Sequence, residues 1–281
     1  MIIKKAVIPA AGFGTRILPA TKAMPKEMYP ILDKPAIQYV VEEAVDSGIT
    51  DILIITNRGK SIIEDHFDVS PELERTLEKN HKYEALESIK KISELANIHF
   101  IRQGFAKGLG HAVYRAKSFI GNEPFAILYP DDVIYSDYKP VCKQLIEAYD
   151  EFGLGVVGAK EVPKDEISKY GSLKVENIRE NLFMCSDMIE KPKPHEVMSY
   201  YSIFGRCVLP PEIFEILKNT PPGIGGEIQL TDAMKILARE KGVIAVDFIG
   251  KRYDIGNKLG ILEAIIETAT RLNYIPPDRT L

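Results

Sequence analysis

Residues 5–16 read Lys5-Ala6-Val7-Ile8-Pro9-Ala10-Ala11-Gly12-Phe13-Gly14-Thr15-Arg16, an apolar run that leads directly into a glycine-rich loop. This order is typical of the first strand of an open α/β sheet, where ligands bind beyond the carboxyl ends of parallel strands. Small residues in such a loop let backbone N–H groups approach phosphate oxygens closely. Arg16 and the nearby Lys22 and Lys26 add positive charge. The stretch therefore predicts an anion-binding loop on an α/β fold.

Strand-like and helical segments alternate through the first 160 residues. Further strand-like runs are rich in Val, Ile and Leu without strict alternation, as in parallel strands buried on both faces; they cover residues 51–56, 99–102, 125–129 and 154–159. Amphipathic segments predict helices between them at residues 36–47, 109–118 and 140–152. Gly48 and Gly153 stand where helix C-caps belong. The alternation predicts a Rossmann-like, mostly parallel sheet flanked by helices.

Three later features depart from this alternation. Residues 61–97 carry many charges and no strand, which predicts two or three exposed helices inserted between strands. Short β runs at 170–176, 182–189 and 200–209 predict a small antiparallel layer covering the substrate. Helices are expected at 227–241 and 257–272. The apolar residues of the last helix predict one face buried against the core or a second subunit; they are Leu259, Leu262, Ile265, Ile266 and Ala269.

Bulk properties limit the classes of function. A length of 281 residues fits a single α/β domain. The net charge of -4 lacks the basic footprint of a nucleic-acid surface. We find no signal peptide and no apolar run long enough to span a membrane, so we expect neither a membrane partner nor export. The three cysteines show no pairing motif and are expected to be buried free thiols, consistent with a cytoplasmic protein.

Other phosphate-binding loops fit the N-terminal stretch poorly. A Walker A loop needs a Gly-Lys-Ser/Thr ending, which is missing here, and a dinucleotide fingerprint needs a third glycine where this chain has Ile17. A literal GxGxxG at residues 153–158 lies where a helix ends and a strand begins, the reverse of the required context. This disfavours a nicotinamide-dependent oxidoreductase. From the loop alone, a tight turn without a ligand remains open.

A second motif follows within a few residues and makes the pattern specific. After the glycine loop come Pro19-Ala20-Thr21-Lys22, Pro25-Lys26-Glu27-Met28, Asp33-Lys34-Pro35 and Gln38-Tyr39. The combined run resembles the signature of bacterial UTP–glucose-1-phosphate uridylyltransferases. Thymidylyltransferases for the same sugar share the Gly-x-Gly-Thr-Arg part but usually carry Ser-Lys-Gln where this chain has Pro25-Lys26-Glu27. The resemblance continues to the last predicted helix, with Cys207 standing where a tyrosine is common.

The resemblance implies roles for a set of residues. Nucleotide binding falls to Ala10, Ala11, Gly12, Gly14, Thr15, Gln103 and Gly108, with the Ala10 backbone, Gln103 and Gly108 expected at the uracil. Arg16 and Lys26 would hold the departing phosphates, and Lys191 the sugar phosphate. Gly171 and Glu190 would bind the sugar. The metal ligands implied for Mg²⁺ are Asp131 and Asp254.

The chemical properties of the side chains support some of these implied roles independently of the resemblance. Asp131 and Asp132 follow a buried strand, and carboxylates suit Mg²⁺, although two aspartates capping a loop explain the pair equally well. Gln103 can donate and accept at a pyrimidine edge. For His111 we favour a histidine at a helix N-terminus over a general base. The pair Glu190-Lys191 could also be an exposed pair of little energetic value. The segment 226–232 also matches the family, and there we expect mainly loop architecture and a helix start.

The expected reaction joins UTP to glucose 1-phosphate. The resemblance further implies a single domain over residues 1–281, with a nucleotide-binding half at 1–160, a sugar-binding half at 161–256 and a C-terminal helix at 257–281. A homodimer or homotetramer is expected from the apolar face of that helix. Two alternatives stay open: the same chemistry with dTTP, and a non-catalytic nucleotide-sugar sensor. A degenerate sensor would be expected to lose carboxylates or lysines, and this chain keeps them.

Overall fold

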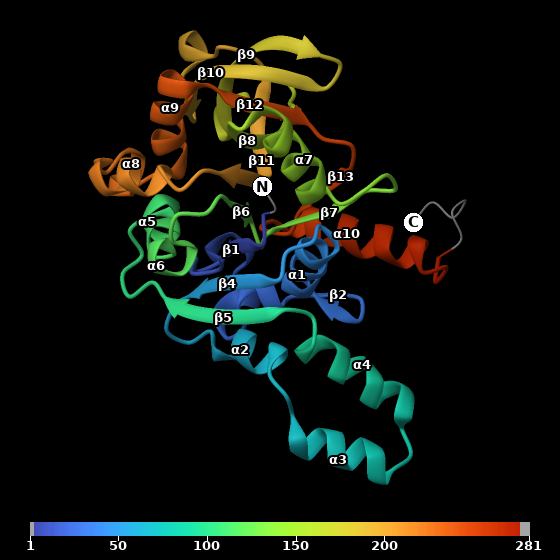
Figure 1. The fold of residues 1–281 in the computed structure, drawn as a ribbon. Coiled ribbons are helices and arrows are strands. Elements are labelled where there is room, and N and C mark those ends of the chain that lie inside the picture. The colour runs from blue at the N-terminus through green and yellow to red at the C-terminus, as the bar shows by residue number, and fades with distance from the viewer. Residues whose placement is uncertain (1–2, 276–281) are drawn as a thin grey trace.

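The computed structural model describes residues 3–275, and a nine-stranded sheet runs through them in the order β5-β4-β1-β6-β11-β8-β12-β10-β9 (Figure 1). The strands are β1 (Lys5–Pro9), β4 (Asp51–Thr56), β5 (Asn97–Arg102), β6 (Phe125–Leu128), β8 (Gly155–Glu161), β9 (Gly171–Arg179), β10 (Leu182–Glu190), β11 (Tyr201–Leu209) and β12 (Val243–Asp247). The predicted fold class, a mostly parallel α/β sheet flanked by helices, is confirmed. All five strands predicted in the first 160 residues are present, within two residues at each end.

The N-terminal part of the sheet is parallel. β1 pairs with β4 and with β6, and β4 pairs with β5, all in parallel register. Successive side chains of β1 enter opposite cores, because side chains alternate across a strand. Ala6 and Ile8 join the core on one face, and Val7 joins the core on the other. Burial on both faces explains why these strands read as continuous apolar runs.

The antiparallel strands of the second half continue the same sheet. β11 lies between β6 and β8 and is antiparallel to both. β12, which the sequence patterns did not predict, pairs parallel to β8, and β10 and β9 extend the far edge. The predicted antiparallel addition to the sheet is therefore present, and its role in covering the substrate stays a prediction. The backbone of β11 finds partners on both sides only inside the sheet, which satisfies its N–H and C=O groups.

Helices cover both faces of the sheet (Figure 1). One core contains residues of α1 (Ala36–Asp46) and α7 (Val141–Phe152). The other core contains residues of α5 (Leu109–Tyr114), α6 (Lys117–Ile120), α8 (Ile213–Asn219) and α9 (Leu230–Lys241). The sequence patterns predicted one helix where α5 and α6 are separate, and they missed α8. Gly153 ends α7 in the left-handed conformation, so the rejected GxGxxG is indeed a helix end followed by a strand.

Two small sheets and the last helix form a third, smaller core. β2 (Pro30–Ile31) pairs with β3 (Lys34–Pro35), and β7 (Asp132–Tyr135) pairs with β13 (Lys251–Asp254), both antiparallel. α10 (Lys258–Arg271) packs on them through Ile261 and Ala264. Two residues of its predicted buried face are exposed, Leu259 by 64% and Leu262 by 53%. Leu259 and Leu262 lie off the line of Ile261, Ala264 and Thr268 that faces the small sheets, so the core covers only part of the predicted face; its burial against a second subunit stays a prediction.

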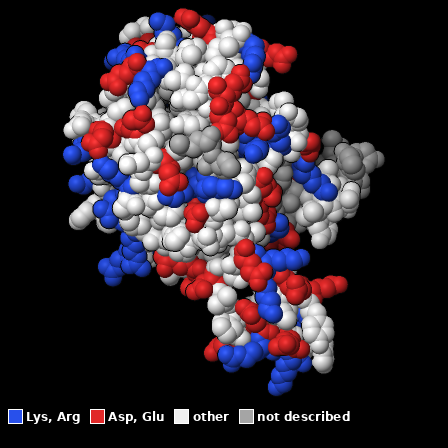
Figure 2. All heavy atoms as spheres, viewed as in Figure 1, with Lys and Arg blue, Asp and Glu red and all other residues white. Residues whose placement is uncertain are grey.

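The charged insert is helical, as predicted, and projects from the body. It consists of α2 (Ser61–Phe67), α3 (Pro71–Lys79) and α4 (Tyr83–Ser93). α3 buries none of its residues. In Figure 2 this arm carries basic and acidic side chains in mixture, with no patch of one sign. The charges form a solvated face.

Within residues 3–275, no helix is both long and apolar enough to cross a bilayer. All three cysteines are buried free thiols, as expected.

Candidate active site

A cavity of about 520 Å³ opens beyond the carboxyl ends of β1 and β6. This is the edge of a parallel sheet where ligands of open α/β folds bind. Predicted site residues from five separate segments line it: Ala11, Gly12, Arg16, Lys26, Gln103, Gly108, Asp131 and Glu190. Phe13, Glu27, Tyr129 and Glu227 complete much of the wall. The fold thus brings residues more than 170 positions apart in the sequence into one site.

The glycine loop leaves β1 and turns sharply at Gly14. Gly14 has φ 67°, a left-handed conformation that favours glycine. Its carbonyl accepts a 2.7 Å hydrogen bond from the Thr21 hydroxyl, which ties the loop to the next segment. Thr15 begins a 3₁₀ turn, Thr15–Ile17, and is exposed, but its side chain does not line the cavity. The loop is therefore held in shape without occupying its outward N–H groups.

Ala10 lies deeper than the sequence suggested. It is fully buried, and its N–H donates to the Ile55 carbonyl at 2.8 Å within the sheet. Its carbonyl accepts from the Lys60 ammonium at 2.6 Å. Of the Ala10 backbone, only the second lone pair of that carbonyl is left for a base.

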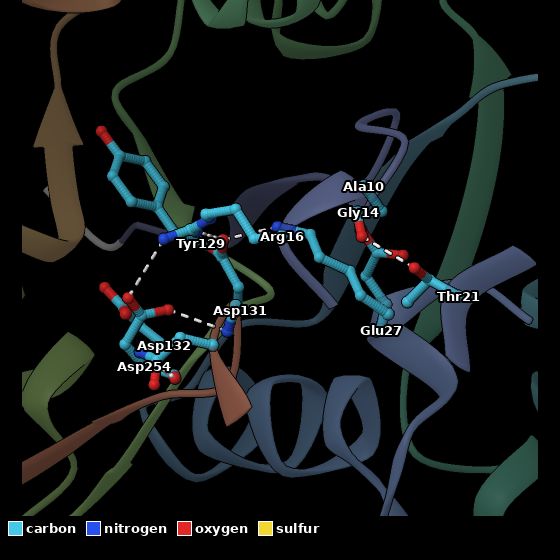
Figure 3. Close-up of polar contacts among 12 residues, drawn as sticks. Ala10, Gly14, Arg16, Thr21, Glu27, Tyr129, Asp131, Asp132 and Asp254 are labelled. Carbon is cyan, nitrogen blue, oxygen red and sulfur yellow. Dashed lines mark hydrogen bonds and ion pairs between the residues drawn. The ribbon is translucent and has the colours of Figure 1, made fainter. Parts of the chain in front are cut away.

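Four charged groups meet beside the cavity: Arg16, Lys26 and Asp131 line it, and Asp254 adjoins them. Figure 3 shows Arg16 together with Asp131 and Asp254. The Lys26 ammonium lies 2.5 Å from Asp131 Oδ2. The Arg16 guanidinium lies 3.5 Å from Asp131 Oδ2 and 3.4 Å from Asp254 Oδ2. Arg16 itself is 60% exposed, so it can move to a ligand at little cost in desolvation.

The small β7–β13 sheet explains how Asp254 reaches this centre. Asp254 stands opposite Asp132 in the ladder, and the Ile255 N–H donates to the Asp131 carbonyl at 2.9 Å. Asp254 Oδ1 accepts from the Gly256 N–H at 2.8 Å, which fixes its carboxylate. No pattern around Asp254 in the sequence reveals this pairing, and only the resemblance pointed to the residue.

The charges at this centre shift one another's protonation equilibria. Burial by itself raises the pKa of Asp131, but Lys26 and Arg16 outweigh it and hold that pKa below its usual range. Burial by itself lowers the pKa of Lys26, and Asp131 and Glu27 reverse this shift and raise it. Asp131 is thus a carboxylate and Lys26 an ammonium at neutral pH.

The residues present suit a hard divalent cation bound mainly through its substrate. Among the described residues, no group of three or more His, Cys, Asp or Glu side chains is arranged as a metal site. Mg²⁺, however, is commonly held by one or two carboxylates together with substrate phosphates. Asp131 and Asp254 supply two such carboxylates, both joined to the mobile cation Arg16.

The neighbouring Asp132 serves the structure and does not face the cavity. It is 3% exposed, and its Oδ1 accepts from Arg252 Nε at 2.7 Å. Burial is the main cause that raises the pKa of Asp132 to about 6, and Asp131 adds to it, while Arg252 opposes the rise. The preference for Asp131 over Asp132 as the ligand-facing carboxylate therefore agrees with the geometry.

Behind these aspartates lies a buried arginine that the sequence patterns did not reveal. Arg206 is 1% exposed and pairs with both oxygens of Glu43 on α1, at 3.0 and 2.5 Å. Its remaining N–H groups donate to the carbonyls of Tyr129, Gly205 and Asp132, at 3.3, 2.9 and 3.0 Å. Two of these carbonyls flank Asp131, so Arg206 anchors the loop that carries it.

The residues predicted to face the base, Gln103 and Gly108, line the cavity from the segment after β5. Gln103 is 6% exposed, and its backbone N–H donates to the Thr56 carbonyl at 2.8 Å. Gly108 has φ 96°, and a Cβ there would lie 2.6 Å from the Ile228 carbonyl, so the position requires glycine. Ile228 bonds to the Lys107 carbonyl and to the Gly110 N–H, both at 2.8 Å. The segment 226–232 thus braces this loop, the architectural role expected for it.

The sugar-side candidates lie at the facing ends of β9 and β10. Gly171 pairs with Glu190 in the ladder, and Glu190 Oε2 accepts from the Thr231 hydroxyl at 2.9 Å. Lys191 follows with φ 47° and an exposed side chain, and its N–H donates to the Tyr170 carbonyl at 2.9 Å. Gly171 and Lys191 do not themselves line the cavity but stand directly beside Glu190, which does.

A second buried ion pair supports the glycine loop. The sequence patterns did not predict it. The Lys60 ammonium lies 2.8 Å from Glu27 Oε2, with both side chains nearly or fully buried. Burial lowers the pKa of Lys60, and Glu27 counteracts that shift. Glu27 Oε1 has no hydrogen-bond partner among the described residues.

We expect Lys60→Met to destabilise the protein by about 3 kcal/mol, because it leaves a buried carboxylate without its cation. Urea unfolding followed by circular dichroism measures this. The matched control is Lys169→Met, which breaks a pair with Glu166 at 62% and 40% exposure. That control should leave stability nearly unchanged, because solvent screens an exposed pair. Equal losses in both variants would contradict the role assigned to Lys60.

Comparison with known proteins places the chain in a family. The family model described as "Nucleotidyl transferase" matches residues 5–271. The chain belongs to the nucleotidyl transferase family. The chain is 51% identical over 267 residues to the UTP–glucose-1-phosphate uridylyltransferase of Bacillus subtilis strain 168, covering 95% of this chain and 91% of that protein. It is 52% identical over 269 residues to a second such protein from Staphylococcus saprophyticus, covering 96% and 93%.

Solved structures of family members agree with these sequence matches. A UDP-glucose pyrophosphorylase complexed with UDP-glucose has a TM-score of 0.88 and 44% identity, covering 96% of this chain and 100% of that one. A UTP-bound enzyme from Acinetobacter baumannii has a TM-score of 0.90 and 38% identity, covering 98% and 95%. The resemblance to bacterial uridylyltransferases of this family, inferred from the N-terminal motifs, is confirmed.

Proposed function

We propose that the chain transfers the uridylyl group of UTP to α-D-glucose 1-phosphate, giving UDP-glucose and pyrophosphate. The observation that carries this proposal is the meeting of Arg16, Lys26 and Asp131 on one wall of the cavity, with Asp254 ion-paired to Arg16 beside it. Gln103 on the base side and Glu190 on the sugar side line the same cavity. The names of the relatives support the choice of substrates.

The reaction makes little demand for proton transfer. A sugar phosphate has a second pKa of about 6, so its attacking oxygen is already ionised at neutral pH. That oxygen attacks the α-phosphorus of UTP in line, and pyrophosphate leaves. The protein's task is to position the two phosphates and to neutralise their charge. No general base is required, which agrees with the placement of His111 behind Gln103 and outside the cavity lining.

Each charged group has a role in this mechanism. Lys26 and Arg16 hold the β- and γ-phosphates, exchanging their bonds to Asp131 and Asp254 for bonds to the nucleotide. Lys191 aligns the phosphate of the sugar. Gly171 and Glu190 bind sugar hydroxyls, Gly171 through its backbone.

A divalent cation fits the same wall. We propose Mg²⁺, with Asp131 and Asp254 as its protein ligands. When bound, it would neutralise charge on the nucleotide phosphates. With Asp131 and Asp254 holding the ion, Arg16 and Lys26 would be available to bind the phosphates.

The expected result of an activity assay is pyrophosphate release when the protein is mixed with UTP, glucose 1-phosphate and Mg²⁺. A coupled phosphate assay after pyrophosphatase treatment measures it. We expect UTP to be used in preference to dTTP. A clear preference for dTTP would replace the proposal with thymidylyl transfer, and binding of UDP-glucose without any turnover would indicate a sensor. Replacing glucose 1-phosphate by galactose 1-phosphate tests the sugar.

The proposal also covers the division of the chain into parts and its assembly. We propose that residues 1–160 form the nucleotide-binding half, residues 161–256 the sugar-binding half, and residues 257–281 a C-terminal helix, of which 276–281 lie outside the described residues. We propose that the protein is cytoplasmic and forms a homodimer or homotetramer. The exposed apolar side chains of Leu259 and Leu262 support an interface between subunits at the last helix. Light scattering in solution measures the assembly.

A further inference from the structure

The side-chain amide of Gln103 is held in one orientation from behind the cavity. Its Nε2 lies 3.1 Å from the Gly108 carbonyl oxygen and 2.9 Å from His111 Nδ1. A carbonyl oxygen only accepts hydrogen bonds, so the amide atom facing it must be the NH₂ group. The two acceptors therefore fix the orientation of the Gln103 amide.

The state of His111 follows from the same geometry. Because the amide nitrogen donates, His111 Nδ1 must accept, and a neutral imidazole that accepts at Nδ1 carries its proton on Nε2. Burial lowers the pKa of His111, and Lys107 and Arg115 lower it further, which favours the neutral ring. His111 is therefore an acceptor at neutral pH.

Both anchors of the amide are themselves fixed. The Gly108 carbonyl also accepts the Ala112 N–H at 3.1 Å, at the start of α5. The Gly108 backbone is confined by Ile228, as described above. His111 lies on the same helix, α5, three residues after Gly108. A rotation of the Gln103 amide by 180° would place its oxygen against two acceptors, the Gly108 carbonyl and His111 Nδ1.

With both amide hydrogens directed at these acceptors, the Oε1 atom of Gln103 is the group left for a ligand. No described residue donates a hydrogen bond to it, and Gln103 lines the cavity. An acceptor at this place suits the N3–H of uracil. Cytosine presents a lone pair at N3 and an NH₂ group at C4, so the same oxygen would face a lone pair.

We propose that His111 is a positioning residue that selects uracil over cytosine by holding the Gln103 amide with its oxygen toward the base. This inference rests on the proposed function, in which Gln103 faces the base of the nucleotide. It adds that the selection depends on the Nε2–H tautomer of a residue that does not line the cavity.

The test compares His111→Leu and His111→Asn with the wild-type protein. His111→Leu removes the acceptor while keeping an apolar side chain, and His111→Asn can place its own carbonyl oxygen where Nδ1 stood. We expect His111→Leu to reduce the ratio of kcat/KM for UTP over CTP by about 10- to 100-fold, the effect of one lost buried polar contact. His111→Asn should retain much of the wild-type ratio. Calorimetric binding of UTP and CTP gives the same comparison without turnover.

Two results would overturn the proposal. One is a His111→Leu protein that loses activity equally with UTP and CTP, because a merely structural role would lower both. The other comes from the wild-type protein and so does not depend on a variant folding: ¹⁵N chemical shifts of His111 that show the proton on Nδ1. A wild-type protein that fails to bind UTP at all would instead refute the proposed function, and its ¹⁵N spectrum would still report the tautomer.

Discussion

Asp131→Asn is expected to lower kcat by about three orders of magnitude or more, because it removes the carboxylate charge that opposes Lys26 and Arg16 and would hold Mg²⁺. The substitution keeps the size of the side chain, so the loop between β6 and β7 should persist. The pyrophosphate assay measures turnover over a range of Mg²⁺ concentrations. The half-saturating Mg²⁺ concentration should rise along with the fall in kcat.

A matched control comes from another aspartate paired with an arginine. Asp137 is 84% exposed and bonds to Arg271, away from the cavity. Asp137→Asn should leave kcat and the Mg²⁺ requirement unchanged. If Asp131→Asn keeps near-normal turnover, Asp131 is not a ligand in the reaction and the proposed charge centre is wrong.

Arg206→Met is expected to produce the largest loss of stability. It leaves the Glu43 carboxylate buried without its cation, and three backbone carbonyls lose a donor. Breaking a buried pair from one side costs about 3–5 kcal/mol, and we expect the upper end here. The midpoint of thermal unfolding should fall by about 10 °C, as calorimetry would measure.

The double variant Arg206→Met/Glu43→Gln separates the two functions of the arginine. Removing the uncompensated charge should restore part of the stability. Turnover should remain low, because the carbonyls on either side of Asp131 still lack their donor. Arg239→Met, which breaks an exposed pair with Asp187, is the control and should leave stability and turnover nearly unchanged. Recovery of both stability and turnover in the double variant would contradict an anchoring role for Arg206.

Several strands and helix ends could be predicted from short stretches of sequence, because their burial or backbone conformation restricts which residues fit. Strands buried on both faces must be apolar throughout, so β1, β4 and β6 were visible as Val/Ile/Leu runs. Helix ends need residues that tolerate left-handed backbone, so Gly153 marked the end of α7. The strands of the second half gave weaker signals. β12 pairs in the interior of the sheet beside β8, and nothing in its five residues indicates that neighbour.

The candidate site likewise combines features that are visible in the sequence with features that depend on the fold. The glycine loop, its positive charges and the acidic pair after β6 could be recognised before the fold was known, because each is a local pattern next to a strand end. The folded chain is needed to join Asp254 to Asp131, through the β7–β13 ladder. It also separated Asp131, which faces the cavity, from Asp132, which Arg252 holds inside.

The buried polar groups depended on tertiary structure most of all. Lys60, Glu43 and Arg206 look like ordinary surface charges in the sequence, since a charged residue gives no local sign of burial. Their partners lie 33 and 163 positions away, and burial is tolerable only once those partners are in place. His111 also gave no sign of its role in the sequence, where it looked like an ordinary residue at the start of a helix. Its contact with Gln103, made through the shared loop after β5, is what gives it a proposed role in recognising the base.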